Sequence, residues 1–283
     1  MSATVESRSK KVFRIFCSVV LGFFWYHSPL NKFRKMKFIS DKEMMKDFSN
    51  GKCIARYGDG EIRIIGDIPS DFYQKNDSKL AKELTNILED KNKNLIVCFP
   101  RPLKTLKGLN LRARLFWISN IFWNRKIWKK CVDLNETYGN TQVTRPYMDY
   151  KNKSKARTRY EELKKIWNNK NVCIIEGENT HLGEGNDLFD NAKTIKRIIA
   201  PAKNAFDKFD EIFEEALKVQ KDYMFLVALG PTATVLVSEL SKLDRTAFDI
   251  GHIDIEYEWM LSGAKKKVAV DGKAVNESGE YGY

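Results

Sequence analysis

The chain has 283 residues, of which 43% are hydrophobic and 30% are charged, and its formal net charge is +12. This composition supports a sizeable core and argues against general disorder, and the length suits either one large α/β domain or one domain with appendages. The five cysteines are odd in number and widely spaced, which argues against a disulfide framework and favours reduced thiols in a cytoplasmic protein.

The N-terminal segment contains an apolar run of 12 residues, 15–26, between two groups of basic residues. The run is shorter than the ~20 residues that span a bilayer, and no small-residue cleavage site follows it. Basic flanks suit a helix at a membrane interface, and a helix packed on the domain is the alternative. We expect a boundary near Lys37, between an N-terminal segment (1–37) and the main domain (38–283). With lipid contact, the protein would be peripheral on the inner face of the cell membrane.

Two carboxylates follow the short apolar run 53–55. Asp59 and Glu61 stand two residues apart between glycines. A divalent cation such as Mg²⁺ is usually held by one or two carboxylates plus substrate phosphates, so this pair is a candidate metal site. Gly58 allows close approach of a ligand to the backbone, and Arg56 supplies a fork of donors that suits phosphate. An ordinary solvated turn is the alternative.

The positive charge is concentrated in residues 99–170, which hold 18 Lys and Arg against 5 Asp and Glu. Within it, 111–130 predicts a basic helix with a broad apolar face, a pattern that suits an anionic membrane surface. Alternatively, Trp117, Ile121 and Trp128 face the core of the domain and the basic side chains are solvated. Because no known nucleic-acid-binding motif is present, we expect no nucleic-acid partner.

The remaining pattern alternates between strand and helix. Short runs rich in Val, Ile and Phe predict buried parallel strands at 52–57, 94–99, 171–176, 194–200, 222–229 and 245–250. Apolar residues at three- and four-residue spacing predict helices at 78–88, 155–167, 205–220, 232–243 and 254–261. The alternation predicts an α/β fold, Rossmann-like and doubly wound, with a mostly parallel sheet.

Polar segments follow four of these predicted strands, at 56–61, 179–192, 230–234 and 249–259. Since the carboxyl ends of parallel strands meet at one edge, we expect these segments to line one crevice. Further candidate ligand-binding residues are Gly185, Asn186 and Asp187; Lys203 and Asn204; and Gly230, Pro231 and Thr232. Pro231 suits the first position of a helix, whose N-terminus would favour a diphosphate. Local turns and exposed lysines are the alternatives.

The segment after the last predicted strand is dense in acidic and aromatic residues. His252, Asp254 and Glu256 are the candidates for work on the acceptor, where a carboxylate could remove the proton of the acceptor hydroxyl. A buried histidine that caps the end of the strand is the alternative for His252. On a helix, Asp254 and Glu258 would share one face while Glu256 points elsewhere. Which of Asp254 and Glu256 acts stays open at this point.

Several phrases, in this order along the chain, resemble the GT-D glycosyltransferases. This family was first described as a domain of unknown function and is found in bacterial surface-glycan and glycoprotein assembly. The phrases are RYGDGE at 56–61, GNDLFDNAKTIKRII at 185–199, PAKNAF at 201–206, ALGPTATVL at 228–236 and DIGHIDIEYEW at 249–259.

The resemblance implies a GT-D-type fold and a hexosyltransferase with a nucleotide-sugar donor, for which a UDP-sugar is the first expectation. It assigns the family's D-x-E metal motif to Asp59 and Glu61, with Mn²⁺ or Mg²⁺ as the cofactor. Arg56, Gly58 and the polar segments would bind the donor. The expected acceptor is a glycan, including one carried on polyprenyl diphosphate. A nucleotidyltransferase, a phosphohydrolase or a non-catalytic membrane-associated scaffold are the alternatives.

Overall fold

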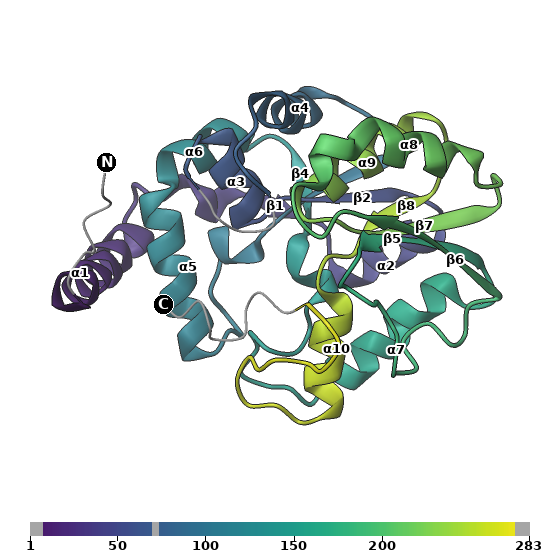
Figure 1. The fold of residues 1–283 in the computed structure, drawn as a ribbon. Helices are drawn as coiled ribbons and strands as arrows, with labels where there is room; N and C mark the ends of the chain where they lie inside the picture. The colour runs from purple at the N-terminus through teal and green to yellow at the C-terminus, as the bar shows by residue number, and fades with distance from the viewer. Residues whose placement is uncertain (1–7, 70–73, 275–283) are drawn as a thin grey trace.

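The predicted doubly wound α/β fold is confirmed by a computed structural model, which describes residues 8–69 and 74–274, with side chains from Cys17 onward. One eight-stranded sheet runs through the molecule in the order β1-β4-β3-β2-β8-β7-β5-β6. Every neighbouring pair is parallel. Helices cover both faces of the sheet, with α4, α8 and α9 on one side and α2 and α7 on the other (Figure 1).

All the predicted strands are present, and the sequence reasoning missed two short ones. The strands are β1 Lys37–Phe38, β2 Cys53–Arg56, β3 Leu95–Phe99, β4 Thr137–Asn140, β5 Asn171–Gly177, β6 Thr194–Ala200, β7 Tyr223–Ala228 and β8 Ala247–Asp249. The missed strands are β1, which has two residues, and β4, which is polar. In β4 only glycine fits at Gly139, because a Cβ there would overlap the Sγ of Cys98 on β3.

The helices follow the prediction with three differences. They are α1 Arg8–His27, α2 Asp41–Ser49, α3 Asp59–Ile65, α4 Ser78–Glu89, α5 Leu111–Trp123, α6 Arg125–Cys131, α7 Ala156–Trp167, α8 Phe209–Lys218, α9 Pro231–Lys242 and α10 Ile253–Leu261. Short 3-10 helices are η1 Lys32–Lys35, η2 Arg101–Leu103, η3 Thr141–Thr144 and η4 Ala205–Lys208.

The first difference is that the predicted helix 111–130 is two helices, because Asn124 ends α5 and begins α6. The second is that η4 precedes α8 in the predicted helix 205–220. The third is that α2 and α3 were not predicted, and α3 starts on Asp59 itself. The two carboxylates therefore lie in the first turn of a helix instead of a free turn.

The sheet is buried on both faces at its centre, which explains its continuous apolar runs. In β5, Val172 and Ile174 pack in the core on the side of α2 and α7. Their neighbours Cys173 and Ile175 pack with α8 and α9. The edge strand β6 differs, since most of its residues are exposed.

The structure joins none of the five cysteines in a disulfide. All five are free thiols, and Cys17 is the one that is not fully buried. Burial raises the pKa of Cys53, Cys131 and Cys173 to about 11. These thiols therefore pack as small apolar groups.

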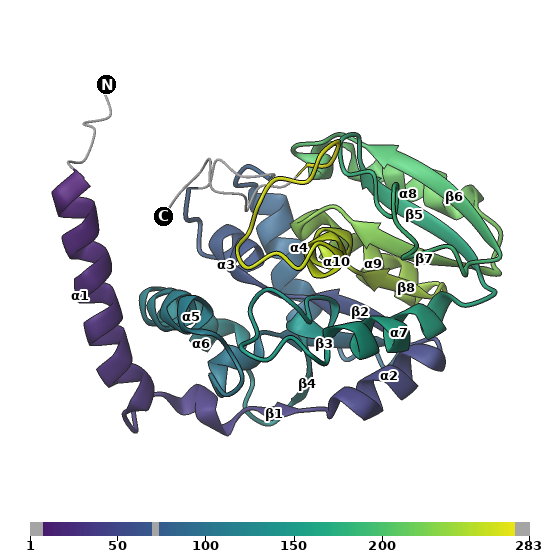
Figure 2. The ribbon, with the colours of Figure 1, turned by 90° about the horizontal axis from the view of Figure 1, so that it is seen from below.

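The N-terminal helix α1 lies at the outside of the molecule, with α5 between it and the sheet (Figure 2). The two helices approach closely, since a Cβ at Gly22 would lie 2.9 Å from Ile118 Cγ2. Trp117, Ile121 and Trp128 are buried in the adjoining core, which confirms the core-packing alternative for these three residues. Among residues 8–69 and 74–274, no helix is both long and apolar enough to cross a membrane.

Candidate functional site

The predicted site residues gather at the carboxyl edge of the sheet, beside its centre. From β2 the chain proceeds outward to β3 and β4, whereas β8, β7, β5 and β6 lie on the other side of β2. The strand order thus reverses between β2 and β8, and open α/β sheets bind ligands at such a reversal. Asp59 and Glu61 follow β2, Gly230 follows β7, and His252 follows β8.

The carboxylate pair lies in the first turn of α3. Gly58 is the N-cap, and its N–H donates to Glu61 Oε2 at 2.6 Å. Glu61 is buried and Asp59 is half-buried. Burial, together with the charges of Asp249 and Asp59, raises the pKa of Glu61 to about 7. Three carboxylates therefore interact at this helix start, and a cation would relieve their repulsion.

The donor set fits a cation that is shared with a substrate. Within the described part of the chain, no group of three or more His, Cys, Asp or Glu is placed to hold an ion. One carboxylate oxygen of Glu61 accepts the hydrogen bond from the N–H of Gly58, and Asp249 is ion-paired with Arg56. Asp59 and Glu61 would thus hold a cation whose other ligands are phosphate oxygens and water, as Mg²⁺ often is.

Arg56 is bound inside the protein at the end of β2. Its Nε and Nη2 each lie 3.1 Å from Asp249 Oδ1 on β8, and its Nη1 donates to Thr144 Oγ1 at 2.7 Å. Thr234 Oγ1 donates to the carbonyl of Arg56 at 2.9 Å. These contacts favour a positioning role for Arg56 over direct phosphate binding. The sequence reasoning did not single out Asp249, although its position at the end of a predicted strand was a usable signal.

Gly251 allows Arg56 to reach Asp249. Its φ is +46°, and a Cβ there would overlap Arg56 Nη2. We expect Gly251→Ala to lower the free energy of unfolding by ~3 kcal/mol, since it combines backbone strain with displacement of a buried ion pair.

The matched control is Gly263→Ala, because Gly263 has a φ of +66° and nothing within 4 Å of the added Cβ. We expect it to cost ~1 kcal/mol from strain alone. Urea unfolding of both variants measures the difference. Equal losses would show that the Arg56 contact is not what requires glycine.

The N-terminus of α9 adjoins that of α3. Pro231 is the first residue of α9, as the sequence predicted. A Cβ at Gly60 in α3 would lie 3.5 Å from Pro231 Cγ, whereas one at Gly230 would meet nothing within 4 Å. The N-termini of the two helices therefore lie next to each other, with open space at Gly230, an arrangement that suits a diphosphate. Thr232 is buried and its hydroxyl lies 3.4 Å from Gln74 Oε1.

The segment after β6 reaches the same edge. Asn204 adopts the left-handed conformation, and its Oδ1 accepts from the N–H of Lys75 at 2.8 Å. Gln74 Oε1 also accepts from the N–H of Phe206 at 3.3 Å, so it links this segment to Thr232. Lys203 is exposed. Gln74 carried no signal in the sequence.

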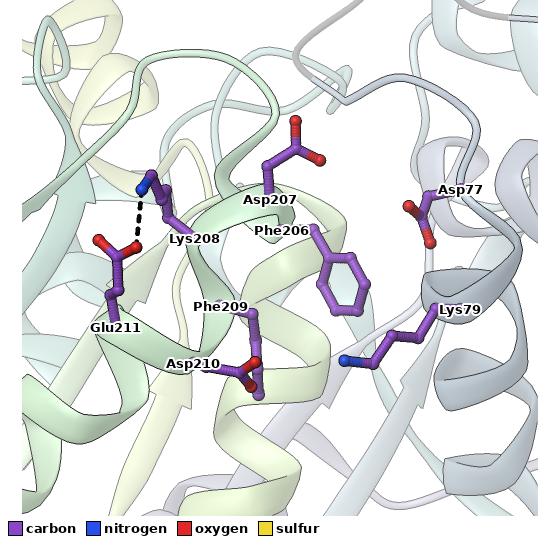
Figure 3. Close-up of a pocket in the computed structure, with 8 residues that line it drawn as sticks. All are labelled: Asp77, Lys79, Phe206, Asp207, Lys208, Phe209, Asp210 and Glu211. Atoms are coloured by element: carbon purple, nitrogen blue, oxygen red, sulfur yellow. Dashed lines mark hydrogen bonds and ion pairs between the residues drawn. The ribbon is translucent and has the colours of Figure 1, made fainter.

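A pocket of about 210 Å³ opens beside this segment, between the start of α4 and η4–α8 (Figure 3). Its lining residues are Asp77, Lys79, Phe206, Asp207, Lys208, Phe209, Asp210 and Glu211. None of the predicted site residues lines it.

The segment after β5 joins α10 through a buried polar cluster. Asn186 Nδ2 donates to Asp254 Oδ1 at 2.7 Å and to Glu258 Oε1 at 2.6 Å. Lys273 Nζ binds the same two carboxylates at 2.7 Å and 3.0 Å. This confirms that Asp254 and Glu258 share one face of a helix. Lys273 could not be predicted, because it lies outside any periodic element.

Other residues of this segment face outward. Gly185 has a φ of +78° with open space around it, so it turns the chain next to Asn186. Asp187 accepts from Lys164 Nζ and from the hydroxyl of Tyr257, both at 2.7 Å. Both hydrogen bonds lower the pKa of Asp187, and the bond from Lys164 has the larger effect.

Glu256 is an internal anchor. It is fully buried, accepts from the N–H groups of Tyr147 at 3.3 Å and Met148 at 2.8 Å, and lies 3.4 Å from Arg145 Nε. These contacts favour a positioning role. His252, by contrast, is half-buried at the N-cap of α10.

Comparisons with known proteins agree with this geometry. A family model described as "Glycosyltransferase GT-D fold" matches residues 54–278. The chain is 38% identical over 232 residues to "Glycosyltransferase GlyD" of Streptococcus pneumoniae. The matched region is 81% of this chain and 28% of that protein. It is 35% identical over 230 residues to "Probable glycosyl transferase Gly" of Streptococcus gordonii, and here the matched region is 80% of this chain and 33% of that protein. The chain thus spans no more than 33% of the length of these two relatives.

A solved structure of the domain of unknown function 1792, described as having a distinct glycosyltransferase fold, superposes with a TM-score of 0.83 at 37% identity. The superposition covers 93% of this chain and 91% of that one.

Proposed function

The chain belongs to the GT-D glycosyltransferase family, and from this premise we propose that it transfers a hexose from a nucleotide-sugar donor to a glycan acceptor. We propose a UDP-sugar as the donor. The acceptor would be part of bacterial surface polysaccharide or glycoprotein assembly, including a glycan on polyprenyl diphosphate. The supporting observation is that the N-termini of α3 and α9 adjoin beside an acidic pair at the edge of the sheet.

In this proposal Asp59 and Glu61 hold Mn²⁺ or Mg²⁺. Such a cation, when bound with the donor, neutralises charge on the leaving nucleoside diphosphate. The start of α9 at Gly230, Pro231 and Thr232 binds the diphosphate. Gly58, whose N–H donates to Glu61, contributes by letting the donor approach the start of α3 closely. Arg56 acts indirectly, by holding β2 against β8.

The nucleoside and sugar would lie toward the ends of β5 and β6. Gly185, Asn186, Asp187, Lys203 and Asn204 are the residues we assign to this part of the donor site. Asn186 would contribute mainly by holding its loop on α10, since its amide already binds two carboxylates.

On the acceptor side, we assign proton removal to His252. Asp254 and Glu256 are both fully buried and bound to protein partners, whereas His252 is half-buried beside the carboxyl end of β8. A neutral imidazole can accept a hydroxyl proton near neutral pH. Asp254 and Glu256 then act as positioning residues for α10.

Binding of a nucleoside diphosphate should depend on a divalent cation. Without the cation, the diphosphate would be repelled by Asp59, Glu61 and Asp249, so we expect UDP affinity to fall by about tenfold or more in chelator. Titration calorimetry with Mn²⁺ and with chelator measures this. Uridine, which lacks the diphosphate, is the control and should be unaffected.

Equal UDP affinity in both conditions would remove the metal from the proposal. A parallel screen of UDP-, GDP- and dTDP-sugars for thermal protection identifies the donor. Incubation with the protecting sugar nucleotide should release the nucleoside diphosphate. Release of a nucleoside monophosphate or inorganic phosphate instead would indicate a phosphohydrolase or nucleotidyltransferase.

A further inference from the structure

The outer face of α1 is apolar and exposed in the part of the helix whose side chains are described, residues 17–27. The helix packs on α5 through its other side, where Trp123 Nε1 donates to Ser18 Oγ at 2.7 Å and Gly22 contacts Ile118. Away from that contact, Phe23 is 50% exposed and Phe24 is 69% exposed. Because α1 lies outside α5, nothing in the described part of the chain lies beyond it (Figures 1 and 2).

More exposed apolar side chains lie on α5 and just after α1. They are Leu30, Leu111, Leu115 and Trp123. We call α1 and α5, with these residues and Phe23 and Phe24, the α1–α5 helix pair. Large exposed apolar groups on two adjacent helices mark a candidate interaction surface.

The charge of the helix pair is of one sign. Residues 8–40, which include α1, contain eight Lys and Arg and no Asp or Glu. Residues 101–132, which include α5 and α6, contain nine Lys and Arg and no Asp or Glu. Lys126, Lys129 and Lys130 are exposed at the end of this second segment. The fold thus brings together two stretches that both lack carboxylates.

We propose that the α1–α5 helix pair docks on an anionic phospholipid bilayer. Apolar side chains surrounded by cations are the pattern of a helix that lies in a membrane interface, where the aromatic groups enter the lipid and lysines meet the headgroups. A second copy of the chain fits less well, because two surfaces without carboxylates repel each other. This surface is separate from the carboxylate pair of α3, so the inference does not rest on the proposed glycosyl transfer.

Co-sedimentation of the full chain with vesicles tests the proposal. We expect binding to equal parts of phosphatidylglycerol and phosphatidylcholine at low salt, and little binding to phosphatidylcholine alone. High salt should weaken the binding, because screening shortens the reach of the lysine charges.

Two variants separate the apolar and the charged contributions. Phe23→Ser with Phe24→Ser should lower the vesicle partition coefficient by about tenfold or more. Lys126→Gln with Lys129→Gln and Lys130→Gln should also lower it by about tenfold or more, since each nearby lysine is worth about a fivefold change. Both variants should keep the thermal unfolding temperature, because the altered side chains are exposed.

Matched controls lie on α8 and in the turns that precede β6, precede β7 and follow α9, away from α1 (Figure 1). Leu217→Ser with Leu243→Ser, and Lys193→Gln with Lys218→Gln and Lys221→Gln, remove exposed groups of the same two kinds, apolar and cationic. These controls should bind vesicles as the wild type does. The proposal is overturned if the intact protein stays in the supernatant, or if the controls lose as much binding as the test variants. A dimeric mass in solution that the Phe23 and Phe24 changes abolish would assign the surface to a second copy instead.

Discussion

Replacing Glu61 with Gln, or Asp59 with Asn, is expected to lower glycosyl transfer by two orders of magnitude or more while the protein stays folded. Each change removes a charge without altering shape, and loss of several kcal/mol of charge stabilisation at the leaving group corresponds to about 100-fold or more in rate. In Glu61→Gln the side-chain oxygen can still accept the N–H of Gly58, so the start of α3 is retained. Steady-state transfer from the donor found by thermal protection measures the effect.

The matched control is Glu43→Gln. Glu43 occupies the equivalent position in the first turn of α2, where its N–H binds the capping Ser40, and its side chain is exposed. We expect wild-type transfer from this variant. Retained turnover in both Asp59→Asn and Glu61→Gln would contradict the assignment of the metal pair.

Glu61→Gln should also change how the stability of the protein depends on pH. The pKa of Glu61 is raised from 4.5 to about 7, so between these values the folded state binds more protons than the unfolded state. The metal-free wild type should therefore lose stability as the pH rises through this range. Glu61→Gln cannot titrate, so its loss should be smaller. Urea unfolding in chelator at about pH 5 and about pH 8 checks the direction.

Replacing Glu256 with Ala is expected to destabilise the protein by ~3–5 kcal/mol, the cost of removing one partner of a buried ion pair. Glu256 is fully buried, and its loss leaves Arg145 and the N–H groups of Tyr147 and Met148 without this carboxylate. Denaturant unfolding measures the change in free energy.

Glu214→Ala is the control for Glu256→Ala. Glu214 is exposed on α8, so its removal should change stability by no more than ~0.5 kcal/mol. If Glu256→Ala instead unfolds like the wild type and fails only in transfer, Glu256 acts on the acceptor and the positioning role is wrong.

Local patterns in the sequence determined the architecture. The apolar runs of β5 and β7 and the helical spacing in α4, α7 and α9 predicted these elements, and their alternation predicted a mostly parallel sheet. They succeed because burial on both faces demands continuous apolar residues, and helix faces demand spacing of three and four. Pro231 marked the start of α9 for an equally local reason, its fixed φ and missing N–H. The five sequence phrases indicated the family, which the match over residues 54–278 confirms.

Only the tertiary structure decided what the polar residues of the site contact. Arg56 meets Asp249 across 193 residues of chain, and Met148 meets Glu256 across 108. No periodicity records such pairs, because each depends on which strands and helices become neighbours. For the same reason Arg56 and Glu256, which as residue types suit phosphate binding and catalysis, turn out to be bound within the protein. The exposure of Phe23 and Phe24 was likewise decided by packing, since α1 has apolar residues on both sides and α5 covers only one.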